Sequence, residues 1–329
     1  MMTAWMLLAA YILDRLIGDP RWLPHPVVGM GKVIAATEKR LRRIMGRWKE
    51  RAALTPTRVR LLGIVLPVVV AGGAFAVTWL LVILAEAVHP WLGWGLETVL
   101  VATTIATKGL ADAGKAIWSP LVKGNLAEAR RALSMVVGRD IERLDEGEIV
   151  RGGVETIAEN IVDAVTAPLF FAAIGGAPLA MAYRAVNTLD AMVGYRDERY
   201  LYLGWASARL DDVVNWLPAR LTVWPMLAAM VFLRLDGRHA WQIIRRDAHR
   251  HPSPNSGIPE AAMAGGLGIR LGGTNWYRGV PSHRGYLGDP KEALHPRHIC
   301  ESIRVLYWTT GLYVCILAVA IIGIDVAAR

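Results

Sequence analysis

The segment LLGIVLPVVVAGGAFAVTWLLVILA, residues 61–85, contains no charged side chain. A helix rises about 1.5 Å per residue, so a segment of this length can cross the roughly 30 Å hydrocarbon core of a bilayer. The segment VLYWTTGLYVCILAVAIIGI, residues 305–324, is also long and apolar enough to span. Together the two segments predict an integral membrane protein.

The composition of the whole chain agrees with this prediction. Of the 329 residues, 54% are hydrophobic, and the mean hydropathy is +0.33. An average soluble domain is less apolar. Three further apolar stretches are interrupted and are therefore weaker candidates for spans: 91–107 by Glu97, 164–182 by Gly175 and Gly176, and 213–233 by Asn215, Pro218 and Arg220.

The N-terminal stretch, residues 2–13, is apolar but short, and Asp14 and Arg15 follow it directly. A signal peptide would have a basic segment before the apolar one and small residues at its cleavage site. The sequence has no such basic segment, and AAYILDRL is a poor cleavage site. We therefore expect a first helix that is retained.

Positive charge is concentrated in residues 32–60. Only Glu38 and Glu50 oppose the basic side chains there, which are Lys32, Lys39, Arg40, Arg42, Arg43, Arg47, Lys49, Arg51, Arg58 and Arg60. Such a segment could bind nucleic acid, but beside a span the positive-inside rule favours a cytoplasmic loop that rests on anionic lipid. We expect no nucleic-acid partner, and we place the arginine-rich segment after residue 233 on the same side.

The remaining chain predicts an all-α fold: a single polytopic membrane-embedded domain over residues 1–329. Residues 108–163 form a polar, cytoplasmic helical segment, with one helix between Asn125 and Gly138 and a second one broken at Gly152 and Gly153. No stretch shows the alternation typical of strands. Residues 247–300 are expected to form a long irregular cytoplasmic loop region that binds substrate.

Common nucleotide and metal motifs are missing from the sequence. No GxxxxGK[ST], HExxH or GxSxG is present, and GLGIRLG at 266–272 has one residue too many for GxGxxG. Cys300 and Cys315 form no CxxC pair, so they suggest neither a disulfide framework nor a zinc site. Any site must therefore be built from less familiar elements.

The segment GVETIAENIVDAVTAP places Glu155, Glu159 and Asp163 four residues apart, on one face of a helix. Three neighbouring carboxylates repel one another unless a cation lies among them, and magnesium prefers oxygen ligands. The pattern suggests a magnesium site. The alternative is an ordinary solvated helix face.

Three other segments place polar groups within apolar surroundings, where they often mark function. The segments are YRAVNTLDAMVGYRDERY with Arg184, Asn187 and Asp190; DRLIGDPRWLPHPVVGMG with Asp14, Asp19 and His25; and ARLDDVVNWLPAR with Asp211. The first could instead be an interfacial loop, the histidine of the second could be structural, and the carboxylates of the third could cap a helix.

The segment DAHRHPSPNSGIPEAAMAGGLGIRLGG, residues 247–273, begins rigid and polar and continues with small residues. A turn of Ser, Asn and Gly ahead of a helix N-terminus can bind an anion, although a purely structural turn is the alternative. The small residues allow another backbone or a flat ligand to approach closely. Its candidate residues are Asp247, His251, Ser253, Asn255, Ser256 and Glu260.

Taken together, these segments resemble the CobD/CbiB family of cobalamin biosynthesis proteins. The resemblance spans nearly the whole chain and rests on several long motifs in the same order: DRLIGDP with the following HP, VGRD, VETIAENIVDAVTAPLFF, YRAVNTLDAMVGY, DDVVNWLPARLT and the segment 247–273. The basic segment and the spans match poorly.

This resemblance implies an ATP- and magnesium-dependent amide synthase. Its substrates would be adenosylcobyric acid and (R)-1-amino-2-propanol phosphate, or the free aminopropanol. An acyl phosphate would activate the carboxylate, and the protein would neutralise phosphate charge and exclude water. Because the positive-inside rule puts the basic segments on the cytoplasmic side, we expect the protein in the inner membrane with its site facing the cytoplasm. A complex with later pathway enzymes, or a homo-oligomer, is compatible with the sequence.

Our role assignments combine this chemistry with the motifs. The carboxylates Glu155, Glu159 and Asp163 are assigned to magnesium. Asp140 and Asp190 are candidate bases, with Asn187 beside Asp190. Phosphate and substrate are assigned to Lys108, Arg139, Arg184, His251, Ser253, Asn255, Ser256 and Glu260. The face from Ala261 to Gly273 would lie against the corrin or the nucleotide.

Two other functions share some of these features. A transporter for a large anionic solute would also have a basic cytoplasmic face and broken helices, but the sequence shows no inverted repeat. A membrane regulator of the AmpE type is distantly similar, yet it would not need both HPSPNSG and VETIAEN. The stretch 164–182 is expected to be a broken, re-entrant or buried helix, because a full span would place YRAVNTLD on the outer side, away from ATP.

Overall fold

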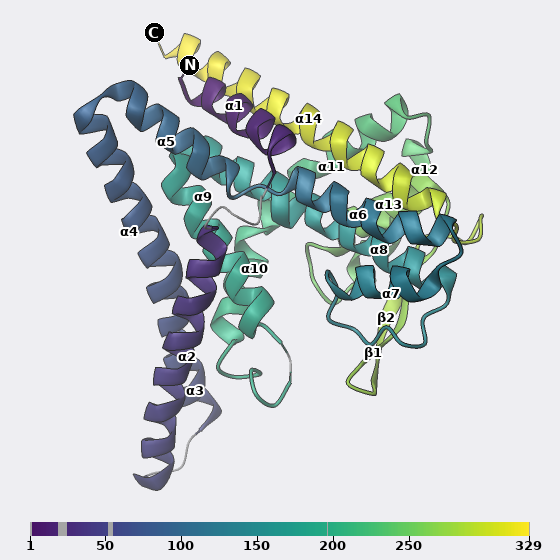
Figure 1. The fold of residues 1–329 in the computed structure, drawn as a ribbon, viewed down its shortest axis with the longest axis horizontal. Coiled ribbons are helices and arrows are strands. Elements are labelled where there is room, and N and C mark those ends of the chain that lie inside the picture. The colour runs from purple at the N-terminus through teal and green to yellow at the C-terminus, as the bar shows by residue number, and fades with distance from the viewer. Residues whose placement is uncertain (1, 19–24, 52–54, 196, 329) are drawn as a thin grey trace. The chain divides into compact units, whose positions relative to one another are not determined.

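The computed structural model describes residues 2–18, 25–51, 55–195 and 197–328, the side chains of 48–51 excepted. Asp19 lies outside the described residues. Helices dominate the described chain, as Figure 1 shows, so the predicted helical membrane fold is confirmed. We treated the sequence as one domain, whereas the packing groups its residues into two compact units. Unit 1 comprises Met1–Ile105, Ala167–Asn215 and Leu317–Arg329, and unit 2 comprises Ala106–Thr166 and Trp216–Ile316.

Unit 1 contains the helices α1 (Met2–Leu16), α2 (Pro26–Arg51), α3 (Pro56–Gly63), α4 (Val65–Val88), α5 (Pro90–Ala102), α9 (Ala167–Val193) and α10 (Trp205–Val214). The prediction of a basic loop over 32–60 is wrong, because most of that segment is α2. Met30, Ile34 and Leu41 recur at helical spacing and pack into one apolar core with Met181 and Leu189 of α9. On the other faces of α2, the side chains of Lys32, Lys39, Arg40, Arg43 and Arg47 are exposed.

Among the residues that the structure describes, three helical stretches are long and apolar enough to cross a membrane: Pro56–Val88, Glu146–Val193 and Arg297–Ala327. The first and third confirm the spans expected from residues 61–85 and 305–324. In the first, only 17% of the apolar window is buried inside the protein, and large side chains such as Trp79 and Leu84 point outward. An outward apolar surface of this extent suits a lipid environment.

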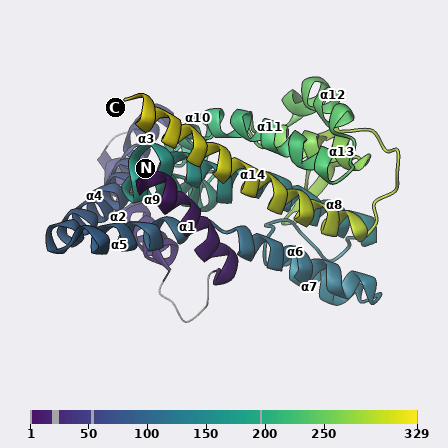
Figure 2. The ribbon, with the colours of Figure 1, turned by 90° about the horizontal axis from the view of Figure 1, so that it is seen from above.

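Helix α9, which lies beside α4 in both views (Figures 1 and 2), is broken as predicted. Gly175 and Gly176 leave helical geometry, and Gly176 has a φ of 62°. The Glu97 carboxylate accepts the N–H of Ala177 at 3.1 Å, which caps the second half of the helix. A Cβ at Gly176 would lie 1.9 Å from Oε1 of Glu97, so glycine is required there. Capping thus explains why a carboxylate, Glu97, lies within the apolar stretch 91–107.

Unit 2 contains α6 (Thr107–Val122), α7 (Leu126–Ser134), α8 (Glu146–Ile161), the π-helical turn η1 (Val162–Thr166), α11 (Trp216–Phe232), α12 (Gly237–Asp247), the short 3₁₀ turn η2 (Ala248–Arg250), α13 (Gly257–Leu267), β1 (Leu271–Tyr277), β2 (Val280–Leu287) and the part of α14 (Arg297–Ala327) up to Ile316. The expected irregular region over 247–300 is therefore wrong, because a helix and a hairpin fill most of it.

Two predicted helix ends within residues 108–163 also need correction. Asn125 caps α7 as expected and accepts the N–H of Glu128, but the helix ends at Ser134 rather than at Gly138. Helix α8 runs through Gly152 without a break. A Cβ at Gly152 would lie 1.9 Å from Nη2 of Arg139, so this glycine makes room for a guanidinium rather than ending a helix.

The strands β1 and β2 form an antiparallel hairpin that the sequence analysis missed. Its two-residue turn is Arg278–Gly279, with φ values of 52° and 78°, the geometry that hairpins favour and that Asn-Gly usually supplies. Asp140 holds this turn: its carboxylate accepts the N–H groups of Arg278 and Gly279 at 2.9 and 2.8 Å. This structural task accounts for Asp140, and we do not keep it as a candidate base.

Helix α13 is buried along its whole length. A Cβ at Gly265 would lie 2.6 Å from Cα of Ala240 in α12, and one at Gly266 would lie 2.6 Å from Sδ of Met230 in α11. Figure 2 shows these three helices as neighbours. The small residues of α13 serve helix packing, so the expectation that they face a corrin or nucleotide is wrong for residues 261–267.

Candidate functional site

A group of ionisable side chains in unit 2 forms what we call the charged cluster. It draws on α8, α13, the hairpin and the loops before α8 and after η2. Its members are the carboxyl groups of Glu155, Glu159 and Glu260, the guanidinium groups of Arg139, Arg151 and Arg284, and the imidazole of His251. Five of these seven residues were predicted from the sequence, and the structure brings them together.

Glu155 is the anchor of the cluster. Its carboxylate pairs with Arg139 at 3.1 Å and with Arg151 at 3.2 Å, and it accepts the N–H of Gly272 at 2.9 Å. The side-chain oxygen of Asn275 accepts from both guanidinium groups. Arg139 was assigned to phosphate, but here its Nη1 is already bonded to two acceptors. Glu155 and its partners therefore tie α8 to β1.

Glu159, one turn after Glu155, faces the serine turn. Its Oε1 accepts the hydroxyl of Ser256 at 3.0 Å. The Ser253 hydroxyl accepts the backbone N–H groups of Asn255 and Ser256 at 3.3 and 3.2 Å. Those N–H groups were expected to hold phosphate, but in the structure they close the turn on itself. The turn consequently offers hydroxyl groups rather than an open backbone cradle.

His251 lies between the serine turn and the carboxyl groups. Its Nδ1 accepts the N–H of Ser253 at 3.0 Å, and its Nε2 lies 3.3 Å from Nη1 of Arg284 and 3.5 Å from Oε1 of Glu260. Burial, followed by the positive charge of Arg284, lowers the pKa of His251 below its usual 6.5. The imidazole is therefore neutral at pH 7 and can accept a proton.

Glu260 is the most unusual member of the cluster. Its side chain is 1% exposed, and within the described chain its buried Oε1 has no hydrogen-bond partner. Burial, followed by the negative charges of Glu155 and Glu159, raises the pKa of Glu260 well above 4.5. A buried polar atom without a partner is rare in proteins and needs an explanation, such as a ligand or a proton-transfer role.

With His251 neutral, the charges of the cluster balance only when all three carboxyl groups are ionised, since three carboxylates then face three guanidinium groups. With a proton on Glu260, one positive charge is left over. Arg284 is the candidate to carry it, because among the described residues it has no carboxylate partner within ion-pair distance, only Tyr277 and His251. A cluster in this state favours an anionic ligand.

The predicted magnesium ligands fit only in part. Among the described residues, no three side chains of His, Cys, Asp or Glu gather closely enough to hold a metal ion. Glu155 is neutralised by two guanidinium groups, and the α-helical spacing that would align Asp163 with Glu159 ends at Ile161, where the π-helical turn begins. Of the three predicted ligands, Glu159 is the one whose carboxylate suits magnesium together with a substrate phosphate.

A second polar group lies in unit 1. Asn215 donates to the Asp211 carboxylate at 3.0 Å and accepts the hydroxyl of Tyr183 at 2.8 Å. Burial, followed by the charge of Asp190, raises the pKa of Asp211 to about 7. Asp190, predicted as a base, therefore belongs to a different unit from the charged cluster.

The other predicted residues have local partners. Arg184 donates to Asn187 at 3.3 Å in α9, and Lys108 pairs with Asp112 at 2.9 Å on α6. The ring of His25 accepts the N–H of Val27 at the start of α2, and Asp14 is buried in α1. Asp247 bonds to Arg246 and to the N–H of Gly288, which joins α12 to the end of β2. None of these contacts is to the charged cluster.

Sequence reasoning missed Arg151, Arg284 and Asn275. Arg151 lies four residues before Glu155, a spacing that indicates a pair on a helix. Arg284 and Asn275 give no such signal, because they come from a hairpin whose strands do not alternate in polarity.

The raised pKa of Glu260 predicts how stability depends on pH. The folded protein holds the proton on Glu260 at pH values where the unfolded chain, with a pKa near 4.5, has lost it. The stabilisation is complete below pH 4.5 and is lost as pH rises through the folded pKa. We expect the free energy of unfolding of the wild type, relative to Glu260→Gln, to fall from pH 4.5 upward. Denaturant titrations of both proteins in detergent test this; a difference independent of pH would contradict it.

The chain is similar to known proteins over almost its whole length. The model of the CobD/Cbib protein family matches residues 7–306. The "Cobalamin biosynthesis protein CobD" of Geobacter metallireducens is 48% identical over 314 residues, 95% of each chain. That of Halalkalibacterium halodurans is 48% identical over 91% of each chain, and the "Cobalamin biosynthesis protein CbiB" of Salmonella typhimurium is 43% identical over 98% of each chain. No solved structure matches.

Proposed function

The chain belongs to the CobD/CbiB family of cobalamin biosynthesis proteins, and from this premise we propose that it is the amide synthase that joins adenosylcobyric acid to (R)-1-amino-2-propanol phosphate or to free aminopropanol. The observation that supports this most is the buried, unpartnered carboxyl oxygen of Glu260, 3.5 Å from a neutral histidine. Forming an amide from an ammonium requires a proton acceptor in a site that excludes water, and the neutral imidazole beside Glu260 meets this requirement.

The reaction needs an activated carboxyl group. In the proposed first step, a propionate oxygen of the corrin attacks the γ-phosphorus of ATP, giving an acyl phosphate and ADP. The amine nitrogen then attacks the acyl carbon, phosphate leaves, and the amide and one proton remain. Arg284, the guanidinium without a carboxylate partner, is assigned to the negative charge that builds up on the transferred phosphate.

The amine arrives as an ammonium and must lose a proton before it attacks. His251 is assigned as the acceptor because its lowered pKa keeps it neutral. Once His251 is protonated, Glu260 beside it passes its own proton to the departing phosphate, and the resulting carboxylate stabilises the imidazolium. The hydroxyl of Ser256, held by Glu159, is assigned to orient the substrate.

Magnesium, when bound with the phosphates, would neutralise part of their charge, and Glu159 is the residue assigned to it. We place the protein in the cytoplasmic membrane with the charged cluster on the cytoplasmic side. The basic segment before residue 61 supports this orientation.

Nucleotide consumption provides a test that separates this enzyme from a transporter or a regulator. Purified protein in detergent should release ADP continuously only when adenosylcobyric acid and the amine are both present. A protein that moves or senses a corrinoid would release none, or would release ADP without regard to the amine. Either of these results would contradict the proposal.

A further inference from the structure

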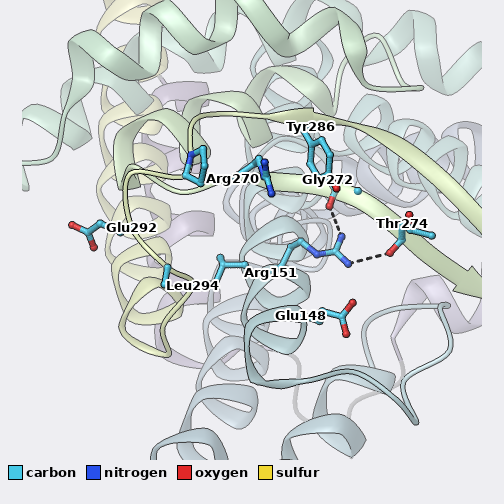
Figure 3. Close-up of a pocket in the computed structure, with 11 residues that line it drawn as sticks. Glu148, Arg151, Arg270, Gly272, Thr274, Tyr286, Glu292 and Leu294 are labelled. Carbon is cyan, nitrogen blue, oxygen red and sulfur yellow. Dashed lines mark hydrogen bonds between the residues drawn. The ribbon is translucent and has the colours of Figure 1, made fainter.

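A cavity of about 400 Å³ opens in unit 2 beside the charged cluster. The first turns of α8 form one side, the hairpin forms another, and the segment before α14 forms the third (Figure 3). A cavity of this size suits a small molecule. Arg151 lies in its wall and also pairs with Glu155, so the cavity and the cluster share a residue.

Two guanidinium groups line the cavity, but only one is engaged. Arg151 donates to the carbonyl oxygens of Gly272 and Thr274, as Figure 3 shows, and to Glu155. Arg270 has no hydrogen bond or ion pair with any described residue. Its guanidinium stacks on the ring of Tyr286, 4.3 Å from the centroid.

The carboxylates in the wall do not neutralise Arg270, because each is engaged elsewhere. Glu148 completes the capping box of α8 with Asp145, accepting its N–H at 3.2 Å. Glu292 pairs with Arg297 and lies 3.6 Å from His298. Arg270 is therefore the guanidinium in the cavity wall that no described carboxylate pairs with, and it offers a local binding point for an anionic group.

The stack on Tyr286 fixes the plane of the guanidinium and leaves its N–H groups available for a planar or tetrahedral anion. The backbone of β1 keeps this space open. Gly273 has a φ of 95°, beside a register shift in the strand, and a Cβ there would lie 3.0 Å from the ring of Tyr286. Irregular strand positions of this kind often occur next to active sites.

We propose that this cavity binds the phosphoryl group of a co-substrate and that Arg270 binds that group through two N–H donors. The inference rests on the proposed function, which requires a phosphorylated co-substrate near the charged cluster. Both the nucleotide and the phosphorylated amine carry the required group, and the experiment distinguishes between them.

The test measures binding by calorimetry, with full-length protein in detergent and without corrinoid. The probes are ATP with magnesium and, separately, aminopropanol phosphate. Arg270→Ala should weaken the Kd of the probe that uses the cavity by roughly tenfold or more. Arg270→Lys, which keeps the charge but not the planar fork, should recover part of that loss. Arg143→Ala removes the same charge from an exposed position in unit 2 and should leave Kd unchanged.

Loss of ATP binding assigns the cavity to the nucleotide, and loss of amine-phosphate binding assigns it to the amine. Wild-type affinity of Arg270→Ala for both probes, or an equal loss in Arg143→Ala, overturns the inference, as does a wild type that binds neither probe. Failure of the proposed function would look different: binding would depend on Arg270, but no amide product would form.

Discussion

Replacing Glu260 by Gln is expected to lower kcat by about a hundredfold or more while leaving the protein folded, in line with the loss of a general acid–base group. The amide has nearly the same volume as the carboxyl group, so packing around α13 is preserved. It cannot ionise, however, and so cannot stabilise a protonated His251, which lies 3.5 Å away. The measurement is steady-state ADP release at saturating corrinoid and amine.

A matched control for this variant is Glu142→Gln, the same change at an exposed position in unit 2. It should leave kcat unchanged. At the pH of the assay, the unfolding midpoint of Glu260→Gln in denaturant should be no lower than that of the wild type, which separates lost chemistry from lost structure. Wild-type kcat in Glu260→Gln would remove this residue from the mechanism.

Replacing Glu155 by Gln is expected to act mainly on the fold and to lower the free energy of unfolding strongly. The change leaves the guanidinium groups of Arg139 and Arg151 buried without their shared carboxylate, and breaking a buried pair in this way costs about 3–5 kcal/mol. The contact between α8 and the hairpin should loosen. Denaturant unfolding followed by tryptophan fluorescence measures the effect, with Trp276 in β1 as a nearby reporter.

Because Glu155 and Glu260 belong to one cluster, the two Glu→Gln variants control for each other. A stability loss under about 1 kcal/mol in Glu155→Gln would show that the buried pairs contribute little, in which case Glu155 would again be available to a metal ion. If Glu155→Gln were stable but inactive, its role would be chemical rather than structural.

The features that the sequence predicted well depend on local patterns. The spans around residues 61–85 and 305–324 follow from hydropathy alone, the cap at Asn125 follows from side-chain chemistry, and the break at Gly175 and Gly176 follows from backbone freedom. Each of these signals is contained in a few consecutive residues, so no knowledge of packing is required.

The features that it missed depend on distant partners. Gly152 was interpreted as a helix break because the neighbouring Arg139 guanidinium cannot be seen in the sequence. The hairpin escaped notice because Arg278–Gly279 is an unusual pair for its turn, which Asp140 stabilises from a distance of 138 residues. For the same reason Glu155 looked like a metal ligand, since nothing in its helix predicts that Arg139 and the N–H of Gly272 would occupy its carboxylate.

The most direct test of the central claim is mass spectrometry of the corrinoid product. Purified protein in detergent would be incubated with adenosylcobyric acid, ATP, magnesium and aminopropanol phosphate, and in parallel with free aminopropanol. An amide synthase should yield a new corrinoid at the mass of the acid plus the amine minus one water, formed about a hundredfold more slowly, or slower still, when Glu260→Gln replaces the wild type. A folded wild type that binds corrinoid yet forms no amide with either amine would contradict the central claim.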